Sequence, residues 1–472
     1  MPMPTWLRMP RIRRSIALAS IVLSVSGLYL LHAEAARPAT GVGTALSSTQ
    51  VSFAGPGGHG TFSTSQSSVL SGSGTLFAQL DLEADREARG LERAPLSLAV
   101  VLDTSGSMSG EKLSEAKRSV ERLVQGMRDD DEILLVRYSD RSEIVQPLAR
   151  VGQVRLALLE RVRQLEASGG TNIPGGLSES ERLLSSASSG RVRRIVLVSD
   201  GLDSSRSRAE DLARESFARG MTVSTLGIGL DFDESYMGSL AQVGHGNFAF
   251  VRDSSTLTAF LERELVEAAS TTLEKGKLRV KLPRGVTLVR VAGAEGREVD
   301  GAVEVDVGSV AAGDRRRIVL ELRAHLEVGE RVPLDAEVSW NRVGGSPVKL
   351  AVVGLALHAT DDMAAIDRSR DGTIFAGATS AFASVRQLEA ALAYTSGDVK
   401  RAEALTEENE KALDLAARIA PAAAAAPLQK QRAAYGEARR DFATVAPRSA
   451  AGNAAAKSVF AKELDNTRKN AF

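Results

Sequence analysis

Five small polar residues in this sequence have the types and positions needed to hold a metal ion. Asp103, Ser105 and Ser107 form the pattern D-x-S-x-S directly after the apolar run AVVL. Thr171 lies in the sequence GGTN, and Asp200 lies in the sequence SDG after the apolar run RIVLV. These side chains offer only carboxylate and hydroxyl oxygens, which are ligands of hard cations. Mg²⁺ suits such a set best, because it needs few charged ligands and keeps several waters, and Mn²⁺ or Ca²⁺ are alternatives.

Each of these signals also has an ordinary structural explanation. Ser107 suits the N-terminal cap of a following helix, and Asp200 suits a turn or a cap. The glycines before Thr171 suit a flexible loop. The metal site is therefore predicted from the combination, because the groups either follow a strand or lie in a loop that faces the ends of the strands.

Strands and helices alternate around these residues. Runs that are apolar almost throughout are typical of strands covered on both faces, and they lie at 96–102, 133–138, 194–199 and 222–229. From 111 to 127, apolar residues recur at steps of three and four, which predicts a helix with one buried stripe. The alternation predicts a doubly wound, Rossmann-like α/β domain in which helices cover a parallel sheet. Ligands bind such sheets beyond the carboxyl ends of the strands, where the strand order reverses.

Residues 95–268 resemble a von Willebrand factor type A domain. The resemblance rests on D-x-S-x-S, on the threonine of GGTN and on the aspartate of SDG, and every position of that motif is filled. In that family the motif forms a metal-ion-dependent adhesion site. The residues to which the resemblance assigns the cation are Asp103, Ser105, Ser107, Thr171 and Asp200. The resemblance also implies that a Glu or Asp carboxylate of a protein partner completes the coordination of the ion.

The chain on either side of this domain predicts further regions. Residues 277–358 contain alternating strands broken by Pro and Gly turns, which predicts an antiparallel β-sandwich-like domain. The segment 75–94 begins with one alternating strand, and a lone strand needs a partner, so it should pair with this later domain. Residues 361–472 are rich in alanine and predict an α-helical C-terminal region. These flanking regions resemble those of exported bacterial proteins with the same domain and, distantly, those of inter-alpha-trypsin inhibitor heavy chains.

The first 35 residues have the pattern of an export signal. Four arginines precede an uncharged apolar stretch at 15–31, and the sequence AEA at 33–35 offers a cleavage site for a signal peptidase. An uncleaved N-terminal membrane anchor is the alternative. Either interpretation places the rest of the chain outside the cytoplasm, as a periplasmic, secreted or envelope-anchored protein. Residues 36–74 are rich in Gly, Ser, Thr and Ala, which predicts a low-complexity lead-in.

The composition limits the classes of function. The 472 residues include 59 basic and 59 acidic side chains, and this zero formal net charge provides no field for binding nucleic acid. There is no cysteine, which excludes disulfides, thiolate zinc sites and cysteine nucleophiles. The 43% of apolar and 25% of charged residues are typical of folded globular domains.

Together these features predict an exported, metal-dependent protein-binding protein that serves in adhesion or as a scaffold. One alternative is a structural component of a cell-envelope complex in which the metal only stabilises the domain. Another is a metal-assisted hydrolase in which Asp103 and Asp200 hold the ion and activate water. No histidine lies near the three loops and no nucleophile lies next to a base, so we expect a protein without enzymatic activity. The sequence does not indicate an oligomeric state.

Overall fold

The computed structural model describes residues 48–86, 94–200, 203, 205–229, 232–251 and 254–469. The described residues form one compact unit. The predicted export signal at 1–35, and the part of the predicted lead-in that precedes residue 48, lie outside the described residues. Within the described ranges, no helix is both long enough and apolar enough to cross a membrane.

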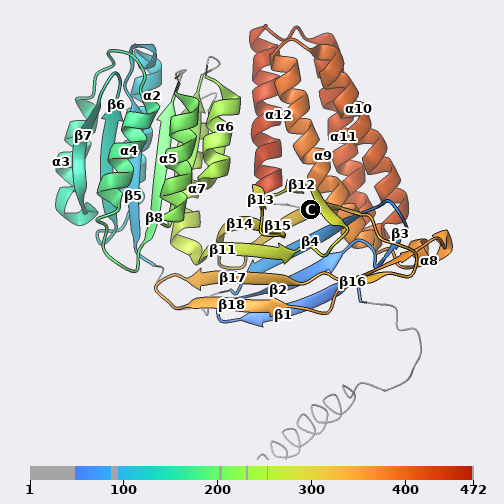
Figure 1. Cartoon of the computed structure of the whole chain (residues 1–472). Helices are drawn as coiled ribbons and strands as arrows, with labels where there is room; N and C mark the ends of the chain where they lie inside the picture. The colour runs from blue at the N-terminus through green and yellow to red at the C-terminus, as the bar shows by residue number, and fades with distance from the viewer. Residues whose placement is uncertain are drawn as a thin grey trace, which may run out of the picture. The chain divides into compact units, whose positions relative to one another are not determined.

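A six-stranded sheet carries the predicted metal site (Figure 1). In chain order its strands are β5 (Leu96–Asp103), β6 (Glu132–Tyr138), β7 (Ser142–Arg150), β8 (Val192–Ser199), β9 (Met221–Ile228) and β10 (His245–Val251). Their order across the sheet is β10-β9-β8-β5-β6-β7. Every residue of β5 and of β9 is buried, as expected for apolar strands in the interior of a covered sheet.

The sheet is mixed, which corrects the prediction of a parallel sheet. β7 pairs antiparallel with β6, while the other neighbouring strands pair in parallel. β7 has a single buried residue and contains Pro147, which an edge strand tolerates because its outer side needs no hydrogen-bonding partner. It therefore lacks the continuous apolar run by which the sequence reveals buried strands. The predicted strands do not include β10 either, which has the sequence HGNFAFV.

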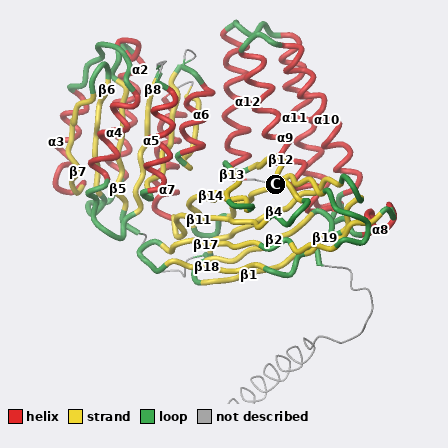
Figure 2. Tube along the Cα trace, viewed as in Figure 1, coloured by secondary structure: helices red, strands yellow, loops and turns green. Residues whose placement is uncertain are grey.

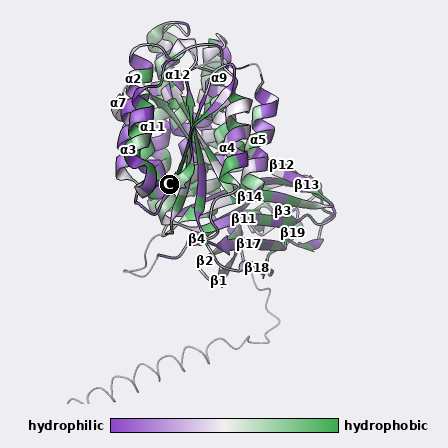
Figure 3. Cartoon of the chain, turned by 90° about the vertical axis from the view of Figure 1, so that its left-hand side faces the viewer, coloured by the Kyte–Doolittle hydropathy of each residue, from purple (hydrophilic) through white to green (hydrophobic). Residues whose placement is uncertain are grey.

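Helices cover both faces of this sheet. They are α2 (Glu111–Gly126), α3 (Val151–Arg163), α4 (Ile173–Leu184), α5 (Arg206–Ala218), α6 (Glu234–Val243) and α7 (Ser254–Ser270). Leu98, Val100 and Leu102 of β5 belong to an apolar cluster with α2, α3 and α7. Ala99 and Val101 belong to a second cluster with α4, α5 and α6. Alternate residues of β5 thus point to opposite faces, and Figure 3 shows hydrophobic strands between helices that carry hydrophilic residues.

The carboxyl ends of β5 and β8 lie side by side at the point where the strand order reverses. The two strands are parallel neighbours, with Leu102 opposite Val198. From β5 the chain continues through α2 to β6 on one side, and from β8 it continues through α5 to β9 on the other side. The loops that follow the two strands therefore separate and leave room for a ligand between them.

Two five-stranded antiparallel sheets form the β-rich region (Figure 2). The first contains β1 (Gln50–Gly55), β2 (Gly58–Thr64), β4 (Gly74–Ala84), β15 (Arg315–Ala324) and β12 (Val286–Ala292), in that order. The second contains β13 (Gly296–Val299), β14 (Ala302–Ala311), β11 (Thr271–Lys281), β17 (Ala336–Arg342) and β18 (Pro347–Val352). A small third sheet contains β16 (Arg331–Pro333), β19 (Ala356–Thr360) and β3 (Ser68–Leu70). Phe62 and Leu80 of the first sheet share one apolar core with Val280 and Trp340 of the second.

Strands from before and after the α/β segment pair with each other. β4 pairs antiparallel with β15 along its length, from Gly74 opposite Ala324 to Glu83 opposite Arg315. This is the kind of partner that the lone strand at 75–83 requires. Because β4 precedes β5 and β11 directly follows α7, the α/β segment is inserted into the β-rich region.

Residues 50–70 form strands, which corrects the prediction of a low-complexity lead-in for the described part of 36–74. Phe62 and Val69 are fully buried, and β2 pairs with both β1 and β4. A Cβ atom at Gly60 would lie 2.0 Å from the backbone oxygen of Asp81, so β2 can approach β4 only with glycine at this position. Here glycine reflects close packing of strands, although the same composition is also typical of a loose segment.

Five helices follow the β-rich region: α8 (Met363–Arg368), α9 (Gly372–Thr395), α10 (Val399–Ile419), α11 (Ala422–Thr444) and α12 (Ala450–Lys469). α9 contacts the β-rich region, where Phe382 packs with Val319. α12 contacts the α/β segment, where Phe460 packs edge to face on Phe248 with their ring centres 5.8 Å apart. The helical region therefore contacts both other regions.

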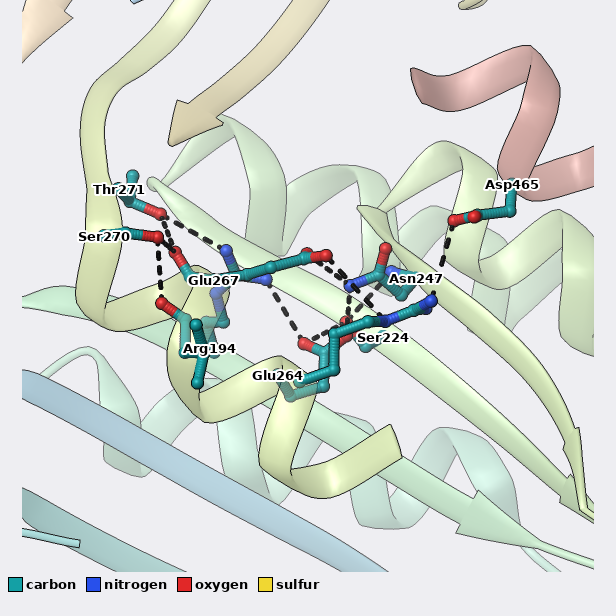
Figure 4. A network of polar contacts seen from close by, with 10 residues as sticks. Arg194, Ser224, Asn247, Glu264, Glu267, Ser270, Thr271 and Asp465 are labelled. Carbon is teal, nitrogen blue, oxygen red and sulfur yellow. Dashed lines mark hydrogen bonds and ion pairs between the residues drawn. The ribbon is translucent and has the colours of Figure 1, made fainter. Parts of the chain in front are cut away.

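A buried polar network fixes α7 beneath the sheet (Figure 4). The Glu264 carboxylate accepts hydrogen bonds from Arg194 at 3.2 Å, from Ser224 at 2.8 Å and from Asn247. Asn247 also donates to Glu267 at 2.7 Å. These partners belong to β8, β9 and β10, so α7 is held by charge-assisted hydrogen bonds as well as by its apolar residues.

Candidate metal centre

Asp103 is the last residue of β5, and its carboxylate is completely buried. The backbone amide of Ser105 donates to Asp103 Oδ1 at 2.8 Å. The hydroxyl of Ser199 donates to Oδ2 at 2.7 Å, and the hydroxyl of Tyr138 lies 3.4 Å from the same oxygen. Because Ser199 ends β8 and Tyr138 ends β6, both strands that flank β5 orient this carboxylate.

Burial raises the pKa of the Asp103 carboxyl group above its ordinary value, and the charge of Asp200 raises it further. Hydrogen bonds from Ser105 and Ser199 oppose this shift in the pKa. Burial, together with the nearby charge of Asp103, also raises the pKa of Tyr138 well above its ordinary value. The Asp103 carboxylate thus lies in an environment that favours a compensating positive charge.

The serines of the D-x-S-x-S pattern connect Asp103 to Asp200. The hydroxyl oxygens of Ser105 and Ser107 lie 3.0 Å apart. The Ser107 hydroxyl donates to Asp200 Oδ1 at 2.8 Å, across the gap between the loops that follow β5 and β8. Asp103 and Asp200 at the two ends of this row are buried, whereas Ser107 is exposed, so the row reaches the surface at Ser107.

The loop that carries Thr171 is held against the D-x-S-x-S loop by backbone hydrogen bonds. The Gly106 amide donates to the Gly169 carbonyl oxygen at 2.9 Å, and the Ser168 amide donates to the Thr104 carbonyl oxygen at 2.8 Å. Thr171 itself is half-buried and directly precedes Asn172, the N-terminal cap of α4. The fold therefore brings the loops of all five predicted residues to one edge of the sheet.

Lys112 also belongs to this site, although the sequence did not single it out. Its ammonium group forms an ion pair with Asp200 Oδ2. The Lys112 side chain is 30% exposed, whereas the Asp200 side chain is fully buried. In this structure the ammonium therefore provides the positive charge that compensates Asp200.

The donor set fits a hard divalent cation. Two carboxylates and two serine hydroxyls lie in one hydrogen-bonded row, and all of them are oxygen ligands. The Ser105 and Ser107 hydroxyls contact each other and Asp200, which are contacts that an ion could replace. In the part of the chain that the structure describes, no group of three or more His, Cys, Asp or Glu residues could hold a metal ion. A cation at this edge would thus depend on hydroxyl groups as well as on Asp103 and Asp200.

Residues 97–263 match the model of the von Willebrand factor type A domain. The mixed sheet covered by helices agrees with that match, so this segment is a von Willebrand factor type A domain. Proteins with such domains generally mediate protein–protein interactions.

Two relatives extend the comparison beyond this domain. The chain is 29% identical over 269 residues to the uncharacterized protein YfbK of Escherichia coli (strain K12), a match that covers 54% of this chain and 45% of YfbK. It is 22% identical over 344 residues to inter-alpha-trypsin inhibitor heavy chain H3 of Mesocricetus auratus, covering 64% of this chain and 38% of that protein. The chain thus spans less than half the length of each of these relatives.

Solved structures share most of the fold. A von Willebrand factor type A protein from Catenulispora acidiphila superposes with a TM-score of 0.66 at 18% identity, covering 89% of this chain and 98% of that one. The ArnB paralog VWA2 from Sulfolobus acidocaldarius superposes with a TM-score of 0.57 at 17% identity, covering 88% and 98%. The shared fold therefore includes the mostly β region and the helical region.

Several residues that shape the site were missed at the sequence level. Tyr138 ends β6 and Ser199 ends β8, the two strands that flank β5, so their places at strand ends are a usable signal. Asp140 accepts a hydrogen bond from the Gly170 amide at 3.0 Å and holds the Thr171 loop, but its exposed position in a turn gives no signal. Lys112 lies in the first turn of α2, where the helix dipole disfavours a cation, and this conflict is the signal that points to another role.

A separate cavity of about 300 Å³ lies away from the metal centre. It is lined by residues of α6, β10, β12, α9 and α12, among them Asn247, Phe248, Leu388 and Phe460. None of the five predicted metal ligands lines it. The edge of β5 and β8 is therefore the place where the predicted chemistry and the geometry coincide.

Proposed function

We propose that this chain is an exported protein-binding protein, for adhesion or as a scaffold, whose von Willebrand factor type A domain contains a metal-ion-dependent adhesion site. The proposed ligands of the cation are Asp103, Ser105, Ser107, Thr171 and Asp200. Mg²⁺ is the proposed ion, with Mn²⁺ and Ca²⁺ as alternatives. The row of hydrogen bonds from Asp103 through the two serines to Asp200 supports this proposal most directly.

The chain's own residues would make the bound ion attractive to an acidic partner. When bound, the cation supplies a positive centre with exchangeable coordination positions. Asp103 is oriented by Ser199 and Tyr138 from within the sheet, and Ser107 is the exposed member of the row. The serine and threonine hydroxyls carry no charge, so they neutralise little of the positive charge of the ion. A Glu or Asp carboxylate of a protein partner would complete the coordination from the solvent side.

The regions around the domain would serve export and support. Residues 1–35 would direct export or anchor the chain, which places it in the periplasm, in the envelope or outside the cell. The two five-stranded sheets would act as a β-sandwich on which the domain is mounted, and the helical region would brace the domain through α12. No nucleic-acid partner is proposed, since the chain carries no net charge.

A pull-down tests the proposal. The chain from residue 37 onward is immobilised and presented with envelope and extracellular proteins in Mg²⁺ or in EDTA. Asp103→Ala removes a proposed ligand, and Asp130→Ala is the matched control, because Asp130 is exposed and precedes the amino end of β6. Circular dichroism checks that each variant is folded. We expect a partner that is retained in Mg²⁺ by the wild type and the control, and lost in EDTA and with Asp103→Ala.

Other outcomes would favour the alternatives. If one partner is retained equally in EDTA and by Asp103→Ala, the β-rich or helical region binds it and the ion serves at most to stabilise the domain. A hydrolase is tested separately with generic phosphoester and peptide substrates in Mg²⁺. Turnover that Asp103→Ala abolishes and Asp130→Ala preserves would replace the binding proposal by an enzymatic one.

A further inference from the structure

Lys112 occupies an unfavourable position unless it serves the metal centre. It lies in the first turn of α2, where the positive end of the helix dipole disfavours an ammonium group. Its ion pair with the buried carboxylate of Asp200 compensates for this cost. We infer that Lys112 sets the charge of the site: it competes with the cation for Asp200 and, once the cation is bound, strengthens binding of the partner's carboxylate. This inference rests on the proposed function.

The surroundings of Lys112 allow its ammonium group to leave Asp200. The Lys112 side chain is 30% exposed and reaches the site from the surface, while Asp200 has no exposure to solvent. A Cβ atom at Gly229, which directly follows β9, would lie 3.3 Å from Lys112 Cε, so the lysine stem passes closely beside this glycine. Asp200 also accepts a hydrogen bond from Ser107 on Oδ1, the carboxylate oxygen that Lys112 does not contact. Lys112 is thus the solvent-accessible partner of the pair, and Asp200 is the buried one.

A count of formal charges shows why the two effects of Lys112 have opposite signs. With Asp103 and Asp200 ionised, the ammonium of Lys112 leaves the empty site with one net negative charge. A divalent cation changes this to one net positive charge, and a partner carboxylate then brings the site to neutrality. Without the lysine, the site has two net negative charges before the cation binds. It has no net charge with the cation and one net negative charge after the partner carboxylate binds. Removing Lys112 therefore favours the cation and disfavours the carboxylate.

The experiment measures both steps on the folded chain from residue 37 onward. Isothermal titration calorimetry measures the Mg²⁺ affinity of the wild type and of Lys112→Met. Electron paramagnetic resonance of Mn²⁺ checks the result. We expect Lys112→Met to bind Mg²⁺ about tenfold more tightly, since one unit charge at contact distance is removed. Fluorine NMR spectroscopy then follows the binding of fluoroacetate, a simple carboxylate, to protein saturated with Mg²⁺. In this second step we expect Lys112→Met to bind the probe about tenfold more weakly than the wild type.

Two further variants separate this role from a general effect of charge. Lys112→Arg keeps the positive charge and should restore both affinities to within about threefold of the wild type. Lys117→Met removes a lysine from the same helix, where it hydrogen-bonds the Arg163 carbonyl oxygen at 2.8 Å, away from Asp200. It should leave both affinities unchanged.

The outcomes distinguish this inference from the proposed function. If the wild type binds Mg²⁺, and Lys112→Met binds it equally or more weakly, the role of Lys112 is refuted and the metal site stands. If Lys112→Met binds both Mg²⁺ and fluoroacetate more tightly, the lysine only competes with the ion and the second half of the inference is wrong. If neither folded protein binds Mg²⁺ or Mn²⁺, the metal site itself fails and the inference fails with it.

Discussion

At the scale of single residues, the proposed metal centre depends on the burial of Asp103. A buried carboxylate loses its hydration, which costs free energy unless hydrogen bonds or a cation compensate. Ser105 and Ser199 provide two such hydrogen bonds, yet the pKa of Asp103 stays raised because burial outweighs them. A bound cation would therefore compensate the free-energy cost of burying the Asp103 carboxylate.

Asp103→Asn tests this balance. Without Mg²⁺ we expect the variant to be at least as stable as the wild type, because the amide removes the buried charge. With Mg²⁺ at about one hundred times its dissociation constant, the wild type should gain about 2.7 kcal/mol in free energy of unfolding, and Asp103→Asn should gain nothing. Thermal unfolding in Mg²⁺ and in EDTA measures both effects, with Asp130→Asn as the control. An equal gain from Mg²⁺ in Asp103→Asn would show that the ion binds elsewhere.

At the scale of elements, the spacing of strands is set by residues that look unremarkable in the sequence. β2 approaches β4 so closely at Gly60 that no side chain fits there. The same strand buries Phe62 in the core that the two five-stranded sheets share. A segment rich in small residues thus becomes part of the core, because β2 pairs closely with β4 and buries Phe62.

Gly60→Ala should be among the more damaging small substitutions in the chain. Its Cβ atom would overlap the carbonyl oxygen of Asp81, and we expect a loss of about 3 kcal/mol in free energy of unfolding. Gly72→Ala is the control, since Gly72 has a φ of +73° but no atom within 4 Å of the added methyl group. The control should lose about 1 kcal/mol. Urea denaturation followed by circular dichroism compares the two, and equal losses would contradict the close approach of β2 to β4.

At the scale of the whole chain, α12 joins the helical region to the von Willebrand factor type A domain. Lys457 donates to the Phe232 carbonyl oxygen at 2.6 Å and forms a buried ion pair with Glu234. Phe460 packs on Phe248 and against Gly238, where an added Cβ atom would overlap its ring. These contacts lie at α6 and β10, so the domain is held by the C-terminal helices as well as by its direct connections to β4 and β11.

Phe460→Ala tests the strength of this attachment. The ring is 5% exposed and belongs to the apolar cluster of the domain, so we expect a loss of about 3 to 5 kcal/mol in free energy of unfolding. Leu415→Ala on α10 is the control, because Leu415 is 56% exposed and should contribute less than about 0.5 kcal/mol. Scanning calorimetry compares the two variants with the wild type. A loss below about 1 kcal/mol for Phe460→Ala would mean that α12 is only loosely attached.

Much of the α/β domain could be predicted from the sequence, because its buried strands are short apolar runs and α2 has a clear apolar stripe. β7 could not, since an edge strand beside solvent needs no apolar run. The strands β1 to β3 could not be predicted either, because a composition rich in glycine and serine occurs both in packed strands and in loose segments. Local pattern therefore reveals strands that are apolar throughout, and misses an edge strand such as β7 and strands built largely from small residues, such as β2.

The sequence by itself determined which oxygen-bearing side chains are available as ligands and that Asp103 and Asp200 lie at the ends of buried strands. Only the tertiary structure decided that β5 and β8 are neighbours, because strand order depends on packing between segments far apart in the chain. The same holds for Ser199 and Tyr138 at Asp103, and for Lys112 at Asp200. Residue types and local spacing are properties of the chain, whereas the charge and burial of the site arise only when separate loops meet at one edge of the sheet.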